Sequence, residues 1–136
     1  MSRKAITTFC VIPSALFLFF IGILHSVVNV SGLQRAIERG EIPARVGDAV
    51  LVNAAFSGAA LSMLGLLVVL VLPGLRAGSR LAGRVATAIG ILVGVVGAAG
   101  YLWAPTKPSV LIFLCCGALL AAPLLIWRRE FSNTLS

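Results

Sequence analysis

Five polar side chains lie within or at the ends of long apolar stretches and are the residues best suited to binding or chemistry: His25, Asn29, Asn53, Ser57 and Tyr101. His25 and Asn29 are four residues apart, as are Asn53 and Ser57, so each pair shares one face of a helix. Counted from the ends of their stretches, the two pairs fall at the same depth, and Tyr101 could close the group. We therefore take the five residues as candidate ligand-binding residues.

Two interpretations of this polar group stay open. In the first, the side chains hydrogen-bond across helices and fix their packing, which contributes about 0.6 kcal/mol per bond on average in membranes. In the second, they line a polar-tipped pocket for a lipid-like or small apolar ligand, or they bind a partner helix. Ionisable groups inside a membrane are functional candidates, and His25 is such a group, whereas Arg84 lies near the start of its span and can extend to the membrane surface.

Catalysis has little support in the sequence, because a single histidine lacks the carboxylate, nucleophile or metal that most mechanisms require. The enzyme hypothesis is a small membrane enzyme acting on a lipid or isoprenoid substrate, with His25 as acid or base and Glu41 assisting. We expect no metal and no cofactor, since the cysteines Cys10, Cys115 and Cys116 lie in apolar runs without metal-ligand spacing. The sequence thus favours a protein that is not an enzyme.

The composition points to lipid as the main solvent. Of 136 residues, 60% are hydrophobic and 11% are charged, against roughly half and roughly a quarter in soluble domains. A soluble chain of this size has too much surface to hide so much apolar area. The net charge of +7 does not indicate nucleic-acid binding, because no basic run is interleaved with stacking aromatic residues.

The apolar runs predict an all-α integral membrane protein with four transmembrane helices in one up-down-up-down bundle, a single domain over residues 1–136. Each run is close to the 20 residues that a span needs, and the loops after the second and third runs are short and rich in Pro and Gly. The predicted spans are about 5–30, 49–72, 81–103 and 109–127.

The longer segment between the first two spans has helix signals of its own. Ser31 and Gln34 have the spacing of a capping box, and Gly40 can end a helix. The sequence therefore predicts a short amphipathic helix over residues 32–39 that lies on the outer membrane surface. Asp48 is expected to cap the second span.

The positive charges predict which side each loop faces. Cytoplasmic segments carry an excess of Lys and Arg, and cytoplasmic termini give seven such residues inside and four outside. The inner set is Arg3, Lys4, Arg76, Arg80, Arg84, Arg128 and Arg129, and the outer set is Arg35, Arg39, Arg45 and Lys107. The residue bias also fits a bacterium with a GC-rich genome, so we expect a multi-pass protein of the bacterial cytoplasmic membrane.

Small residues mark the predicted helix contacts, because apolar burial gives helices in lipid no advantage and close backbone approach is needed instead. They are Gly90, Gly94 and Ala98 in the third span and Gly58 in the second. Contacts within the chain are favoured over a dimer interface. Residues 21–28 also recur as 89–96 with six of eight positions identical, which either a duplication or a chance match between apolar segments would explain.

The sequence thus favours a small, non-enzymatic membrane protein. Its expected partners are the lipid bilayer, a lipid-like or small apolar ligand, a partner membrane protein or a second copy of the chain, with no nucleic acid. The small membrane enzyme and a subunit of an oligomeric transporter remain as alternatives.

Overall fold

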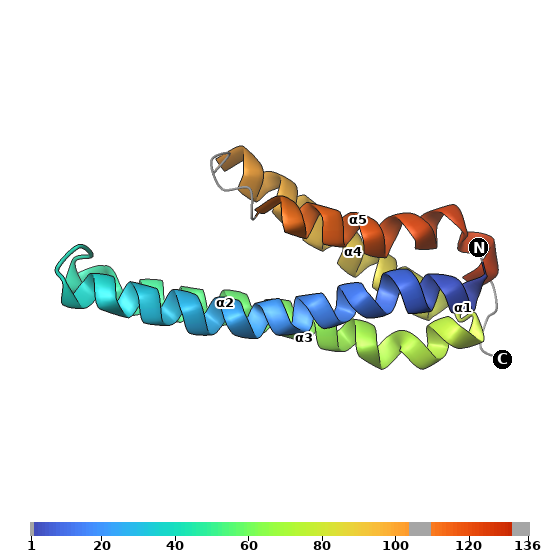
Figure 1. Ribbon diagram of the computed structural model, residues 1–136, viewed down its shortest axis with the longest axis horizontal. Coiled ribbons are helices and arrows are strands. Elements are labelled where there is room, and N and C mark those ends of the chain that lie inside the picture. Colours follow the sequence, from blue (N-terminus) through green and yellow to red (C-terminus); the bar gives the residue numbers. More distant parts are fainter. Residues whose placement is uncertain (1, 104–109, 132–136) are drawn as a thin grey trace. The chain divides into compact units, whose positions relative to one another are not determined.

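Long helices make up most of the chain, as the apolar runs predict. The computed structural model describes residues 2–103 and 110–131. Its main helices are α2 (Ile12–Glu38), α3 (Ala44–Ala77), α4 (Arg80–Trp103) and α5 (Leu111–Ile126) (Figure 1). Shorter turns flank them, namely α1 (Arg3–Ile6), the π-helical turn η1 (Thr7–Val11) and the 3-10 turn η3 (Arg128–Phe131). The predicted all-α class with four main helices is confirmed.

Three helical stretches are long and apolar enough to cross a membrane: Thr7–Glu38, Arg45–Ala77 and Arg80–Trp103. The fourth apolar helix, α5, has 16 residues, which at 1.5 Å per residue is about 24 Å, against a hydrocarbon core of about 30 Å. Four apolar helices are therefore present, but α5 is shorter than the predicted fourth span. The predicted start of that span at Ser109 lies outside the described residues.

The predicted surface helix over residues 32–39 is wrong, because α2 continues without a break to Glu38. Ser31 does not cap a new helix. Its hydroxyl donates to the carbonyl oxygens of Val27 at 2.7 Å and Val28 at 3.2 Å, within the same helix, as serine does inside helices. No residue between 30 and 38 stops the helix. The polar residues at its C-terminal end therefore continue the same helix as the apolar residues before them.

The second span also begins and ends elsewhere than predicted. Helix α3 begins at Ala44, so Asp48 lies inside it and does not cap it. Pro73 is likewise inside α3 rather than in a loop. The helix runs to Ala77, and the loop that was expected at Pro73 and Gly74 is displaced to Gly78 and Ser79.

Two glycines end the long helices by the same device. Gly40 and Gly78 have φ of 75° and 81°, which suits a residue without a Cβ. After α2, Gly40 N–H donates to Ile37 and Glu41 N–H to Ala36, both at 2.9 Å. Gly78 and Ser79 make the equivalent bonds after α3, at 3.0 and 2.8 Å. Both patterns are Schellman motifs, and Gly40 stops the helix as predicted.

The described chain divides into two compact units. Unit 1 comprises Met1–Leu16 and Leu67–Ser136, and unit 2 comprises Phe17–Leu66. Both boundaries fall inside the continuous helices α2 and α3. Each unit is described by itself, and the single bundle over the whole chain stays a prediction.

Unit 2 is an antiparallel pair, formed by the parts of α2 and α3 on either side of the Gly40 turn (Figure 1). Gly22 lies against Gly58 and Ser62, and Ser26 lies against Gly58. A Cβ at Gly58 would overlap the Gly22 carbonyl oxygen and the Ser26 hydroxyl, and would lie 2.8 Å from the Ser26 nitrogen. The two backbones are therefore in direct contact.

Unit 1 contains a second antiparallel pair, α4 and α5, built in the same way (Figure 1). A Cβ at Gly90 would lie 2.8 Å from the Ala121 nitrogen, and one at Gly117 would lie 2.6 Å from the Gly90 oxygen and overlap the Gly94 nitrogen. Gly90 is buried and Gly94 and Ala98 are partly exposed. The predicted small-residue ridge of the third span thus faces α5 in the same chain at Gly90 and Gly94.

The two pairs share one packing motif. Gly58 fits against Gly22 and Ser26, and Gly117 fits against Gly90 and Gly94. Residues 22 and 26 correspond to 90 and 94 in the eight-residue segments that repeat in the sequence. The two similar segments therefore make equivalent helix contacts.

Large apolar side chains cover the outside of these helices. Val27, Phe56, Leu70, Val95 and Leu102 are each at least 60% exposed, and only 17% of the most apolar window of Arg45–Ala77 is buried. Exposed apolar surface on this scale is unfavourable in water, and it matches helices that face lipid.

A bulky side chain at Gly58 should separate the unit 2 pair. We expect Gly58→Leu to lower the free energy of unfolding in detergent micelles by about 1–3 kcal/mol, as overpacking does. The matched control is Gly32→Ala in the same unit, where nothing lies within 4 Å of the added Cβ. That change should be neutral or stabilise by up to about 1 kcal/mol through helix propensity. Equal losses in the two variants, measured by circular dichroism, would contradict the contact.

Candidate functional site

His25 and Asn29 of α2 are brought together as their spacing predicts. The side-chain amide nitrogen of Asn29 lies 2.9 Å from each ring nitrogen of His25. The amide can donate to whichever ring nitrogen carries no proton, so the bond requires an unprotonated acceptor on the imidazole. Both residues are partly buried, and the contact orients the ring along the helix.

Asn53 and Ser57 of α3 behave differently from each other. The Ser57 hydroxyl donates to the carbonyl oxygen of Ala54 at 2.9 Å, within its own helix. Asn53 is exposed, and its side chain has no hydrogen-bond partner among the residues that the structure describes. Both donors and the acceptor of this amide are therefore available to another molecule.

The two pairs lie on one side of unit 2 and at one level. Each residue turns a helix by about 100°. In two antiparallel helices, the residue just before a contact residue therefore projects to the same side of the pair from both helices. His25 precedes Ser26, and Asn53 precedes the buried Ala54. Ser26 bonds to Ala55, so Asn29, one turn further on, lies level with the turn of Asn53. That the four residues form one site stays a prediction.

Tyr101, the fifth predicted residue, is near the end of α4 and is 39% exposed. It belongs to unit 1, whereas the other four residues belong to unit 2. Its place beside them stays a prediction.

Two serines that sequence reasoning left aside make hydrogen bonds between α2 and α3 within unit 2. Ser26 donates to the carbonyl oxygen of Ala55 at 3.1 Å, and Ser62 donates to that of Phe19 at 3.0 Å. Both lie beside the glycines at which the backbones meet. The sequence signal was the four-residue spacing of small residues, Gly22 with Ser26 and Gly58 with Ser62.

The loop carboxylate that the enzyme hypothesis requires is remote from His25. Glu41 pairs with Arg39 at 2.7 Å, and both side chains are more than half exposed. The straight run of α2 from His25 to Glu38 separates the two groups by about 20 Å at 1.5 Å per residue. Glu41 therefore cannot act on a group bound at His25.

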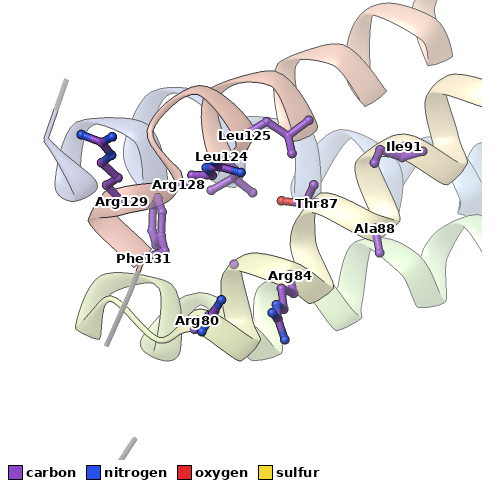
Figure 2. A pocket seen from close by; sticks show the side chains of 11 residues that line it. Arg80, Arg84, Thr87, Ala88, Ile91, Leu124, Leu125, Arg128, Arg129 and Phe131 are labelled. Atoms are coloured by element: carbon purple, nitrogen blue, oxygen red, sulfur yellow. The ribbon is translucent and has the colours of Figure 1, made fainter. Parts of the chain in front are cut away.

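A second site lies in unit 1, where arginines at the ends of two helices surround one pocket of about 760 Å³. Arg80 and Arg84 come from the first turns of α4, and Arg128 and Arg129 come from η3, just after α5. Figure 2 shows them around the opening, with the Thr87 hydroxyl directed into the space between the helices. Sequence reasoning used these arginines only to orient the chain. Their positions at the start and end of consecutive antiparallel helices could have shown that they meet.

Metal ligands do not gather among the described residues, where no group of three or more His, Cys, Asp or Glu side chains could hold an ion. Comparison of the chain with protein-family models, with curated proteins and with solved structures finds no significant match. The geometry of the chain's own residues therefore carries the functional argument.

The hydroxyls of Ser26 and Ser62 should contribute to the stability of unit 2. We expect Ser26→Ala and Ser62→Ala each to lower the free energy of unfolding by about 0.6 kcal/mol, the mean for hydrogen bonds between membrane helices. Ser57→Ala serves as the control, because its hydroxyl bonds only to its own helix and its loss should change stability less. Denaturation in mixed micelles would measure the three values, and a larger loss in Ser57→Ala would contradict the assignment.

Proposed function

We propose that the protein is a multi-pass protein of the bacterial cytoplasmic membrane whose α2–α3 pair recognises a partner helix within the bilayer. The observation that carries the proposal is Asn53, an exposed amide without a partner among the described residues, level with the His25–Asn29 pair. A polar amide on an apolar helix surface is costly in lipid unless another polar group satisfies it. A hydrogen-bonding group on a neighbouring helix meets this need.

Charge distribution supports an orientation with cytoplasmic termini. Unit 2 carries Arg35, Arg39 and Arg45 against Glu38, Glu41 and Asp48, so its formal charge is zero. The whole formal charge of +7 therefore resides in unit 1. Its arginines flank the loop after α3 and the end of α5, and cytoplasmic loops carry such an excess. The turn after α2 then faces outward, and the polar side of unit 2 lies in the outer half of the membrane.

A partner helix fits the site better than catalysis does. His25 is engaged by Asn29 at 2.9 Å, and Glu41 is too distant to assist it. Asn53, on the same side, offers two donors and an acceptor at an open surface, and asparagine promotes association of membrane helices. A lipid-like ligand with a hydrogen-bonding head is the other occupant that this chemistry admits, and the experiment below distinguishes it by mass.

The orientation is tested with single cysteines in a chain whose Cys10, Cys115 and Cys116 are replaced by alanine. Glu41→Cys and Ala77→Cys place thiols at opposite ends of α3, where both native residues are exposed. We expect a membrane-impermeant maleimide to label Glu41→Cys in intact cells and Ala77→Cys only after permeabilisation. The reverse pattern would place the termini outside, and labelling of both from outside would mean that α3 does not cross.

Partner binding is tested by a photo-crosslinker beside Asn53. Phe56→p-benzoylphenylalanine places the crosslinker one turn away at a side chain that is 71% exposed. In native membranes we expect an adduct of discrete mass, and Asn53→Leu should lower its yield roughly fivefold or more, since such amide bonds contribute about 1–2 kcal/mol in model helices.

Ser57→Ala is the matched control for this experiment and should leave the adduct unchanged, because its hydroxyl is satisfied within α3. An adduct the size of a lipid would replace the partner helix by a ligand. An unchanged yield in Asn53→Leu would reject the site, and a loss of intrinsic stability in that variant would assign Asn53 to packing within the chain.

A further inference from the structure

We propose that the arginine pocket of unit 1 binds the phosphate of an anionic phospholipid and takes the upper part of an acyl chain between α4 and α5. The pocket shares no lining residue with the polar side of unit 2, and the proposal rests on the membrane location and orientation proposed above.

The two walls of the pocket show the same change from charged to apolar. Along α4, the lining residues share one face at helical spacing: Arg80, Arg84, Thr87, Ala88 and Ile91. Along the opposite wall the arginines are again outermost and leucines lie one turn deeper, as Arg128 and Arg129 against Leu124 and Leu125. A ligand that fits both walls has an anionic head and an apolar tail, which is the structure of a phospholipid.

Four arginines border the pocket, and one acidic residue, Glu130, is adjacent to them in the sequence. Among the side chains that the structure describes, no carboxylate pairs with these arginines, and the ion pair found there joins Arg39 and Glu41 in unit 2. Helix α4 has no acidic residue in its first turn, so Arg80 and Arg84 sit near the positive end of its dipole. Cations at this end are unfavourable and an anion is favourable. A bound phosphate would reduce the repulsion between the arginines. It would also offset the unfavourable interaction of Arg80 and Arg84 with the positive end of the α4 dipole.

Packing of η3 on α4 keeps the pocket formed. Phe131 is 4% exposed, and its Cβ would lie 3.2 Å from a Cβ placed at Gly83. This close contact holds η3 against the first turns of α4, so that Arg128 and Arg129 line the same pocket as Arg80 and Arg84. In Figure 2 Arg128 lies beside Leu124, whereas the Arg129 side chain points away from Arg80 and Arg84. Guanidinium groups bind phosphate oxygens through paired N–H donors, so the arginines that line the pocket supply the donors that a phosphodiester needs.

The apolar half of the pocket favours a lipid over free phosphate. Thr87, Ala88, Ile91, Leu124 and Leu125 offer an inorganic phosphate one hydroxyl and otherwise no polar contact. The same surface can cover methylene groups, each worth burying in an apolar site. Basic pockets between membrane helices on the cytoplasmic side are suited to anionic head groups, and the proposed orientation places this one there.

The test uses the full chain, purified and exchanged into a zwitterionic detergent. The protein would be titrated with dioleoyl phosphatidylglycerol, and with dioleoyl phosphatidylcholine as the zwitterionic control. Native mass spectrometry would measure the lipid bound in each case. We expect one tightly bound phosphatidylglycerol, and Arg84→Gln/Arg128→Gln should weaken its binding about tenfold or more through the loss of two charge-assisted contacts. The matched control, Arg39→Gln/Arg45→Gln, removes the same charge from unit 2 and should leave binding unchanged.

A second variant fills the pocket without changing its charge. Ala88→Phe should weaken phosphatidylglycerol binding, because the side chain occupies the space for the acyl chain, while retention of all four arginines keeps any binding of inorganic phosphate. Equal losses in the two double variants would mean general attraction to charge and would overturn the proposal. Two further outcomes would assign the pocket to a free anion and overturn the proposal. In one, phosphatidylglycerol still binds to Ala88→Phe. In the other, millimolar inorganic phosphate displaces phosphatidylglycerol.

Discussion

Direct contact between helix backbones is the constraint on which the rest of this structure depends. Helices in lipid gain nothing from hiding apolar side chains from one another, so they associate where small residues let their backbones touch. Gly58 meets Gly22 and Ser26 in this way, and Gly117 meets Gly90 and Gly94, with Gly97 against the Leu114 backbone as a further contact of α4 and α5. Because the backbones meet there, the Ser26 and Ser62 hydroxyls reach carbonyl oxygens of the facing helix.

The register set by these contacts determines which polar groups are used and which stay open. Ser26 and Ser62 point across the interface, and Ser57 bonds to its own helix. One residue before the contact positions, His25 and Asn53 project to the side of the pair. Unit 2 therefore has a polar side on which the Asn53 amide is exposed and has no hydrogen-bond partner in the part of the chain that the structure describes.

The charged residues are unevenly distributed between the two units. Unit 2 is neutral and unit 1 carries the whole excess of +7. Residues that mark the cytoplasmic side in the sequence are gathered in space, since α4 begins where α5 ends in an antiparallel pair. The arginines that predict the orientation of the chain thus also line a pocket with a charged rim and an apolar interior. This pocket is the basis of the proposed lipid site.

The sequence by itself determined the helical class, the approximate apolar spans, the helix stop at Gly40 and the pairing of His25 with Asn29, because these depend on hydropathy, backbone freedom and spacing within one helix. It mistook residues 32–39 for a separate helix and misplaced the ends of α3, because a cap signal is weak where the backbone can simply continue as a helix. Only the tertiary structure decided that Ser57 is satisfied locally, that Asn53 is open and that four arginines share a pocket. Those outcomes depend on register between helices, which hydropathy does not encode.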